Sequence, residues 1–357
     1  DEVHVYRVGE KENIALGKPA VQSSLSRWSK VHAIGRSEQQ RVYPTEQVIA
    51  RGLQLAEKLR PLNAKIEAQA SELAHLSERL ARLAKDAPAE QRRALYLESR
   101  WIVRRMALAN PLLDFDTILF TKRIPPGFPH MSDEYYGWWS RGGGGLFLLK
   151  GIAADRPQAQ SLTEGWEPGS FIRPDLSFDG KRVLFAYARF YPEVHKIADK
   201  VNKDNVPEDA FYQIYEMGLD GSGARRLTHG KYDSFDARYL PNDDIVFLST
   251  RKGQSVQVTA CTAQATLDMP NLPDAYVRCG GGNHRPVPVF TLHRMKADGT
   301  HLLPISAFEN FEWTPSIAAD GRIVYARWDY IDRFNGPFMS LWSKNPDGTN
   351  PQLVYGN

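Results

Sequence analysis

One phrase that predicts a tight turn followed by a strand occurs three times in the second half of the chain. The copies read SFDGKRVLFAYAR at 177–189, LPNDDIVFLSTR at 240–251 and AADGRIVYARWD at 318–329. Asp-Gly and Asn-Asp pairs tolerate positive φ angles and therefore favour tight turns. The runs behind them are β-branched and aromatic, which is typical of half-buried strands. The repeat therefore constrains the fold to regularly repeated hairpins.

A second phrase alternates with the first. It reads IYEMGLDGSGARRLT at 214–228, LHRMKADGTHLLPIS at 292–306 and LWSKNPDGTNPQLVY at 341–355. Each copy predicts a strand, an Asp-Gly turn and a further strand, so the two phrases together predict a four-stranded antiparallel sheet. Repetition of such a sheet is typical of β-propeller blades. A β-sandwich is the alternative, but it gives no reason for two different phrases to alternate.

The intervals between copies exceed the roughly 40–45 residues of a plain blade. Each predicted blade therefore carries an insertion, at 190–210, 252–287 and 331–338. Strands at 115–123 and 145–151 predict a further, partial blade that precedes these three.

The blades are expected to form an incomplete propeller over residues 111–357. Propellers usually have four to eight blades, and ring closure protects their edge strands. With about four blades predicted, we expect an open arc whose last blade, near 341–355, is exposed, and a chain that is a piece of a longer protein.

Residues 45–110 have a different composition, rich in Ala, Leu, Glu, Arg and Gln, and predict an α-helical hairpin with a coiled-coil seam or a short bundle. Pro61 interrupts the helical pattern, and a third helix is expected from about Glu90 to Asn110. The seam is formed by leucines spaced three and four residues apart: Leu73, Leu76, Leu80 and Leu83. Residues 51–105 contain 12 Lys and Arg against 7 Asp and Glu, which indicates a solvated helix surface rather than a nucleic-acid stripe.

Composition excludes several classes of protein. The 357 residues are 42% hydrophobic and 24% charged, as in an ordinary globular protein, and a net charge of +3 does not favour nucleic acid as a partner. No apolar run of about 18 residues predicts a transmembrane segment. The His-Glu-x-x-His, Gly-x-Ser-x-Gly and Cys-x-x-Cys-His motifs do not occur, so the sequence does not support a zinc protease, a serine hydrolase of that type or attachment of haem c.

An ordered series of phrases over residues 90–357 resembles the hydrazine synthase alpha-subunit-like proteins, multidomain bacterial proteins frequent in planctomycetes. The phrases are LANPLLDFDTILFTKR, HMSDEYYGWW, GGGGLFLLKG, EPGSFIRPDLSFDGKRVLFAYA, RPVPVFTLHRM, EWTPSIAADGRIVYARWDYIDR and NPDGTNPQLVYGN. The resemblance implies a middle-domain propeller with Tol-B-type repeats, a periplasmic or extracellular location and partner protein subunits. Its relatives bind haem c, but this chain lacks the attachment motif, so no cofactor is expected in this segment and hydrazine synthesis is not carried over.

Residues 1–44 read as an extended N-terminal segment. Within it, NIALGKPAVQSS resembles the opening of discoidin-like carbohydrate-binding domains, although only about the first 24 residues match. The sequence therefore predicts a binding or scaffold region of a larger assembly. Two alternatives stay open: part of a redox enzyme subunit whose haem domain lies outside this chain, and a carbohydrate-binding module.

The first candidate site is the loop PHMSDEYYGWW, in which polar and aromatic groups that suit binding or metal ligation gather between two strands. Its candidate residues are His130, Asp133, Tyr135 and Tyr136, with Glu134 among them. Packing of Trp138 and Trp139 over a core edge is the alternative.

Two further candidate sites follow. In RWDYIDR, Asp329 and Asp332 could bind Ca²⁺ through oxygen, but Arg–Asp pairs that close a turn explain the same residues, so we expect Asp329 to be structural. In RCGGGNHRPVP, Cys279 and His284 supply half of a zinc site, or belong to a plain loop. Cys261 and Cys279 form a disulfide or remain two free thiols.

Overall fold

The computed structural model describes nine stretches of the chain: 43–62, 64–84, 86–124, 142–197, 203–251, 276–277, 287–308, 311–328 and 339–356. The chain divides into two compact units, and each is described by itself. The helical unit spans Asp1–Thr117 and Lys150–Pro157, and the β unit spans Ile118–Leu149 and Gln158–Asn357.

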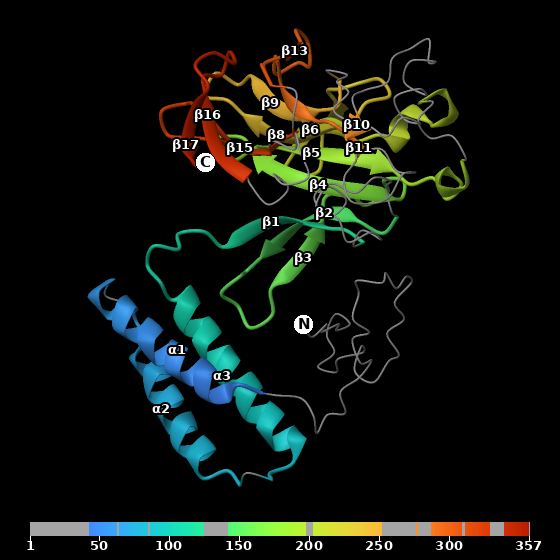
Figure 1. The fold of residues 1–357 in the computed structure, drawn as a ribbon. Helices are drawn as coiled ribbons and strands as arrows, with labels where there is room; N and C mark the ends of the chain where they lie inside the picture. Colours follow the sequence, from blue (N-terminus) through green and yellow to red (C-terminus); the bar gives the residue numbers. More distant parts are fainter. Residues whose placement is uncertain are drawn as a thin grey trace. The chain divides into compact units, whose positions relative to one another are not determined.

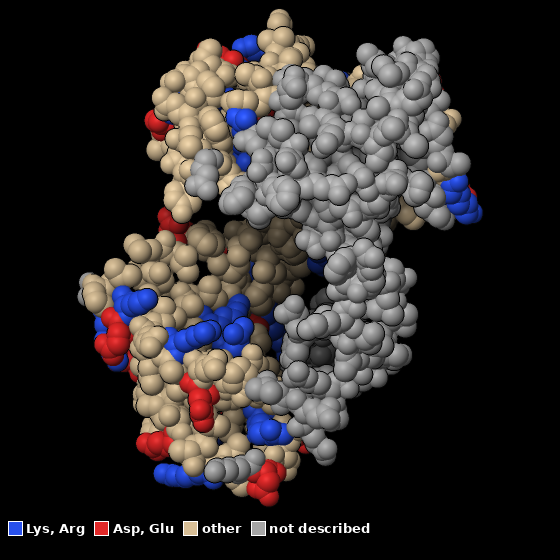
Figure 2. Space-filling view, viewed as in Figure 1, with Lys and Arg blue, Asp and Glu red and all other residues tan. Residues whose placement is uncertain are grey.

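The helical unit contains three packed helices. They are α1 (Thr45–Leu59), α2 (Glu67–Ala81) and α3 (Ala89–Leu108), and a 3-10 turn, η2 (Arg60–Leu62), follows α1. Gly52 lets the helices approach closely, because a Cβ there would lie 2.6 Å from both Leu73 Cδ1 and Val103 Cγ2. On the face that Figure 2 shows, Lys and Arg gather over this unit with Asp and Glu between them. Arg79–Glu98 at 2.8 Å is one of several exposed ion pairs, so this surface is solvated and mixed in charge.

The β unit is built from antiparallel sheets, which confirms the predicted four-stranded repeat (Figure 1). We call its main sheets blades I to IV. Blade I contains β1 (Thr117–Lys122), β2 (Gly145–Lys150) and β3 (Gln158–Ser161). Blade II contains β4 (Gly169–Leu176), β5 (Arg182–Arg189), β6 (Gln213–Gly218) and β7 (Arg225–Arg226), and blade III contains β8 (Ser234–Tyr239), β9 (Ile245–Ser249), β12 (Thr291–Met295) and β13 (Leu303–Pro304). Blade IV contains β14 (Phe311–Ile317), β15 (Ile323–Trp328), β16 (Met339–Lys344) and β17 (Gln352–Tyr355). A two-stranded sheet, β10 (Tyr276–Val277) with β11 (Val287–Pro288), lies between β9 and β12 in the chain, and three short 3-10 helices, η3 (Val194–Lys196), η4 (Lys203–Asn205) and η5 (Glu208–Ala210), lie between β5 and β6.

Consecutive blades pack face to face, as in a propeller. Leu146 and Phe185 belong to one core shared by blades I and II, and Leu184 and Phe247 belong to the core shared by blades II and III. A third core contains residues of blades II, III and IV. Within the described ranges, no strand of blade IV pairs with a strand of blade I, so the structure shows a propeller-type row of blades and no closed ring.

The two repeated turns have different structural roles. In the first phrase, Gly180 and Asp243 adopt φ angles of +67° and +64°, as the sequence predicts. In the second phrase, the glycine lies directly against the preceding blade. A Cβ on Gly348 would lie 2.4 Å from the Ile305 carbonyl oxygen. Gly221 and Gly299 approach the carbonyls of the preceding blades in the same way. The second phrase therefore repeats because each of its turns packs into a junction between blades.

Blade I corresponds to the second, third and fourth strands of the other blades. The Leu162 N–H donates to the Leu146 carbonyl at 2.8 Å, as the Leu227 N–H donates to the Ile214 carbonyl at 2.8 Å in blade II. β2 is therefore a third strand and β1 a second strand. Helix α3 directly precedes this region in the chain, so no described residue supplies an innermost strand to blade I.

Candidate functional site

The innermost strands of blades II, III and IV share a strained backbone position. A β-bulge interrupts each of these strands where it pairs with the second strand of its blade. At these bulges Arg173, Asp236 and Thr314 have φ angles of 53°, 54° and 47°. A non-glycine residue in this region is uncommon, and such residues concentrate at functional sites. Bulges also redirect side chains near active sites.

The local sequence explains two of the three bulges. Pro174 follows Arg173 in β4, and Pro315 follows Thr314 in β14. Proline has no N–H to donate to the neighbouring strand and is therefore confined to edge strands and bulges. An innermost strand is an edge strand, so the fold accepts proline there.

Charged side chains surround the bulges of β4 and β8. The fully buried Asp236 carboxylate lies 2.5 Å from the Arg238 guanidinium, which also lies 3.9 Å from Asp175. The Tyr239 N–H donates to Asp175 at 3.1 Å. Burial raises the pKa of the Asp175 carboxyl, and the positive charge of Arg238 opposes that shift. These contacts link the inner strands of two blades through polar groups.

We call these side chains, together with the polar residues at the β14 bulge, the inner-strand cluster: Arg173, Asp175, Asp236, Arg238, Thr314 and Ser316. β8 contacts both β4 and β14, so the cluster spans three adjacent blades. Thr314 and Ser316 are exposed, and Arg173 is half-buried. The cluster thus brings hydroxyl groups and the partly exposed Asp175 carboxylate and Arg238 guanidinium to the innermost strands, which suits hydrogen bonding to a polar ligand.

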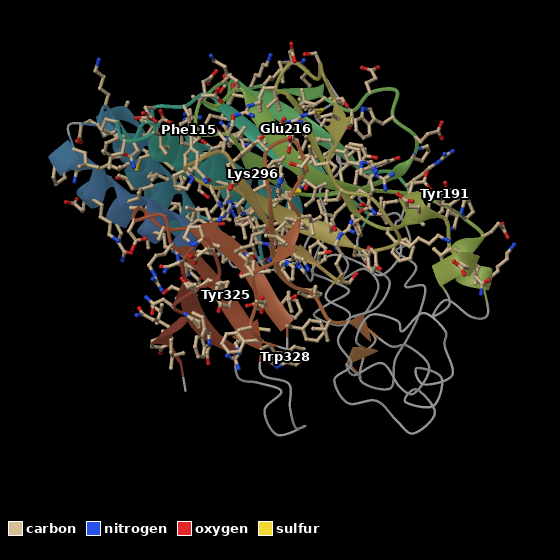
Figure 3. The ribbon with its side chains drawn as sticks, turned by 90° about the horizontal axis from the view of Figure 1, so that it is seen from above. Phe115, Tyr191, Glu216, Lys296, Tyr325 and Trp328 are labelled. Carbon is tan, nitrogen blue, oxygen red and sulfur yellow. The ribbon has the colours of Figure 1, made fainter. Side chains whose placement is uncertain are left out.

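A second polar group lies at the junction of blades II and III, and we call it the Glu216 node. The buried Glu216 carboxylate accepts hydrogen bonds from Arg182 at 3.1 Å, from Arg225 Nε at 2.9 Å and from the Tyr239 hydroxyl at 2.8 Å. Burial and the hydrogen bond to Glu216 raise the pKa of Tyr239. Figure 3 shows Glu216 well separated from Tyr325 and Trp328 of blade IV.

A third polar group is a charge pair buried at the junction of blades III and IV. Lys344 Nζ lies 2.8 Å from Glu312 Oε1 and 4.5 Å from the centre of the Tyr325 ring. The Lys344 and Glu312 side chains are 1% and 0% exposed. Burial lowers the pKa of Lys344, although Glu312 opposes that shift. The Leu292 N–H of blade III donates to Glu312 Oε2 at 2.6 Å, so the pair joins two blades.

The candidate residues chosen from loop composition lie outside the described residues: His130, Asp133, Glu134, Tyr135, Tyr136, Cys261, Cys279, His284, Asp329 and Asp332. All of them belong to connections between the second and third strands of a blade. Arg327, beside the RWDYIDR candidates, is described. Its guanidinium lies 3.5 Å from the centre of the Phe308 ring and 4.8 Å from that of Trp342.

The described residues include no metal-binding cluster and no membrane-spanning helix. Among the side chains described, no three His, Cys, Asp or Glu residues gather in a way that could hold a metal ion. No described helix has both the length and the apolar character needed to cross a membrane.

Sequence reasoning missed the inner-strand cluster because it looked for sites in loops. The available signal was a proline in the segment that precedes the first turn of a blade, at Pro174 and again at Pro315. In a strand that otherwise alternates, such a proline marks an edge or a bulge.

Comparison with known proteins gives only distant similarities. No protein-family model matches the chain, and no curated protein matches it. A putative TolB from Agrobacterium tumefaciens is 19% identical, with 60% of this chain and 57% of that chain covered and a TM-score of 0.39. Hydrazine synthase from Kuenenia stuttgartiensis is 16% identical, with coverage of 68% and 32% and a TM-score of 0.45. An oligogalacturonate lyase in complex with manganese is 11% identical, with coverage of 60% and 48% and a TM-score of 0.35. The chain thus spans less than two thirds of the length of each.

Proposed function

We propose that the β unit is a binding and scaffold region that recognises a polar segment of a partner protein through the inner-strand cluster. The observation that carries the proposal is the repetition of one strained, polar position in three adjacent blades. Strain of this kind costs on the order of 1–3 kcal/mol at each residue, and it persists only where the surrounding structure imposes it. The carboxylate–guanidinium contacts hold the site in one geometry before a ligand arrives, which reduces the ordering cost of binding.

We further propose that the chain is part of a hydrazine synthase alpha-subunit-like protein that works outside the cytoplasm. The support is the ordered series of sequence phrases over residues 90–357. Fractionation of the native organism tests the location, and recovery of the chain in the cytoplasmic fraction would contradict it.

Site-specific photo-crosslinking tests the binding site. A photoreactive side chain in place of the exposed Ser316 should capture a defined partner in the native organism. The control is the same side chain at Gln160, which is exposed on β3, an outermost strand. Capture at both positions, or at neither, would reject the inner-strand cluster as the binding site.

A variant separates recognition from folding. Ser316→Arg places a long cation among the exposed groups of the cluster and should reduce partner binding at least tenfold, with an unchanged thermal midpoint. Gln160→Arg adds the same side chain at the control position and should leave binding unchanged. Equal binding by the two variants would count against the proposal.

We also propose that this segment carries no covalently attached haem. Haem c attachment needs a Cys-x-x-Cys-His motif, and Cys261 and Cys279, the two cysteines of the chain, are far apart in sequence. The purified chain, expressed with haem-maturation machinery, should show no Soret band after acid–acetone extraction. A band that survives extraction would contradict this expectation and favour the redox-subunit alternative.

A further inference from the structure

The Asp-Gly pairs of the β unit can rearrange chemically, and all of them lie in described turns. They are Asp179-Gly180, Asp220-Gly221, Asp298-Gly299, Asp320-Gly321 and Asp347-Gly348. In such a pair the glycine nitrogen can attack the side-chain carboxyl carbon of the aspartate, because glycine has no Cβ to hinder the approach. The turns differ in how strongly they restrain this reaction.

Two hydrogen bonds are common to all these turns and therefore do not distinguish them. In the turn of blade IV, the Gly321 N–H donates to the Ala318 carbonyl at 2.9 Å, and the Asp320 carboxylate accepts a hydrogen bond from the Arg322 N–H at 3.0 Å. The other turns contain the same two bonds at corresponding residues.

Packing separates the turns of the second phrase from those of the first. The second-phrase glycines lie directly against a carbonyl of the preceding blade. Closure of a five-membered imide ring moves the main chain at the glycine, so these turns cannot close the ring without disturbing a blade junction. The first-phrase glycines have more room. No atom lies within 4 Å of an added Cβ at Gly180, and the nearest atom at Gly321 is Pro241 Cγ, at 3.7 Å.

A hydroxyl group separates the two first-phrase turns. Ser177 Oγ donates to the Asp179 carboxylate at 2.5 Å, and the Ser177 hydroxyl and the Lys181 N–H lower the pKa of that carboxyl. Ring closure proceeds most readily from a protonated carboxyl that can rotate, so these bonds protect Asp179. Blade IV has Ala318 in place of Ser177, and no hydroxyl of the described residues donates to Asp320.

The exposure of Asp320 does not depend on where the row of blades ends. Asp179 in blade II and Asn242 in blade III occupy the same place in their turns. Both are exposed, although a further blade follows each of them. Water therefore reaches this turn position in each of the three blades.

We propose that Asp320-Gly321 is the site at which this chain isomerises spontaneously through a succinimide, in preference to its other Asp-Gly pairs. The Gly321 nitrogen attacks Cγ of the protonated Asp320, a C–N bond forms, and the amide proton leaves with the carboxyl hydroxyl as water. Another water molecule then opens the ring at the main-chain carbonyl of Asp320. This leaves a free α-carboxyl group and lengthens the main chain between β14 and β15 by a methylene group. The reaction does not involve the partner proposed for the inner-strand cluster.

Peptide mapping of the full chain tests the proposal. After prolonged incubation of the folded protein in mildly acidic buffer, isoaspartate in the Asp320 peptide should exceed that in each other Asp-Gly peptide by about tenfold or more. Electron-transfer fragmentation identifies isoaspartate, and the unchanged peptide mass separates isomerisation from deamidation at Asn335. In urea, all the pairs should react at similar rates, which would assign the difference to the fold.

A reciprocal exchange tests the role of the hydroxyl. Ala318→Ser gives Asp320 the hydroxyl of the blade II turn and should slow its isomerisation by about tenfold, the worth of a hydrogen bond to a charged group. Ser177→Ala should accelerate the reaction at Asp179 by a similar factor. Thermal midpoints verify that each variant folds.

Thr300→Val is the matched control for packing. It removes the hydroxyl that donates to Asp298 at 2.7 Å but leaves Gly299 against the preceding blade, so the Asp298 peptide should remain slow.

Equal isoaspartate levels in all peptides of the folded chain, or a preference for another pair, would overturn the proposal. A folded Ala318→Ser chain that isomerises at Asp320 as fast as the wild type would do the same. If Ala318→Ser does not fold, Ser177→Ala carries the same test in blade II.

Discussion

The Glu216 node, between blades II and III, and the Glu312–Lys344 pair, between blades III and IV, differ in how they hold charge. At the Glu216 node, a carboxylate that is 5% exposed binds Arg182 and Arg225, whose side chains are 35% and 42% exposed. At the other junction, Glu312 and Lys344 are both removed from water. The Glu216 node keeps its cations partly hydrated while they bind the acid, whereas water reaches neither partner of the Glu312–Lys344 pair.

The buried lysine is unusual because the other blades use an apolar side chain at its position. Lys344 pairs with Ile323, as Met217 pairs with Val183 in blade II. Met295, the third side chain in this set, is also buried. Blade IV therefore places a charge where two sister blades use methionine, and Glu312 compensates it. A buried pair is seldom more stable than an apolar replacement, but a broken pair is strongly destabilising.

The largest effect should come from breaking the buried pair. Glu312→Ala removes the charged partner of the buried Lys344 and the acceptor of the Leu292 N–H, and should lower the free energy of unfolding by about 3–5 kcal/mol. The double variant Lys344→Met with Glu312→Gln restores the side chain of the sister blades and keeps an acceptor for the Leu292 N–H. It should recover most of the loss in urea unfolding. A single variant as stable as the wild type would show that the pair is not buried in solution.

A smaller loss of stability is expected at the Glu216 node. Glu216→Ala removes the acceptor of two guanidinium groups that still reach water, and should cost about 1–3 kcal/mol. The effect should shrink in high salt, because exposed charges are screened more strongly than buried ones. Urea unfolding at low and high salt measures this. An effect of Glu312→Ala with the same salt dependence would remove the distinction between the Glu216 node and the Glu312–Lys344 pair.

The glycine turns should behave alike at the two junctions. Gly348→Ala and Gly299→Ala each force a Cβ toward a carbonyl oxygen, at 2.4 Å and 2.6 Å, on a backbone with positive φ. Each should cost about 1–3 kcal/mol. Gly180→Ala is the control, since it has positive φ but no atom within 4 Å of the added Cβ. A control variant as costly as Gly348→Ala would assign the whole effect to backbone strain.

The smallest effect concerns pH. Hydrogen bonds from Thr300 lower the pKa of the Asp298 carboxyl, and those from Thr349 lower the pKa of Asp347. A carboxyl group whose pKa is lowered by folding stabilises the folded state at pH values above the ordinary aspartate pKa. That stabilisation is lost as the pH falls through the lowered pKa of the folded state. Asp298→Asn and Asp347→Asn should thus reduce stability slightly at neutral pH, and the reduction should vanish in acid. A difference that grows in acid would contradict the assignment.

The turns and strands were predictable because their signals are local. Asp-Gly and Asn-Asp pairs mark positive φ angles, and Gly180 and Asp243 adopt them. The β-branched runs behind these pairs form strands such as β5 and β9. Two alternating phrases were enough to predict antiparallel four-stranded sheets.

The polar features at the junctions were not predictable in the same way. Lys344 lies in a run that reads as a strand end before a turn, and nothing near it in sequence indicates burial. Its environment depends on Glu312 and on the facing blade, so it follows from packing between distant segments. The residues chosen from loop composition, such as His130, lie outside the described residues and remain predictions.

The two ends of each blade differ in how much change in length they can accept. The long connections between the second and third strands of a blade, such as 190–212 and 250–290, lie at one end of its strands. The short turns, between the first and second strands and between the third and fourth, lie at the opposite end. Doubling the length of a flexible connection adds only about 0.6 kcal/mol of closure entropy. One residue added to the turn at Gly348 would instead displace it from the Ile305 carbonyl. Evolution can therefore lengthen the first end and acquire new recognition segments there, while the short turns hold the blades in register.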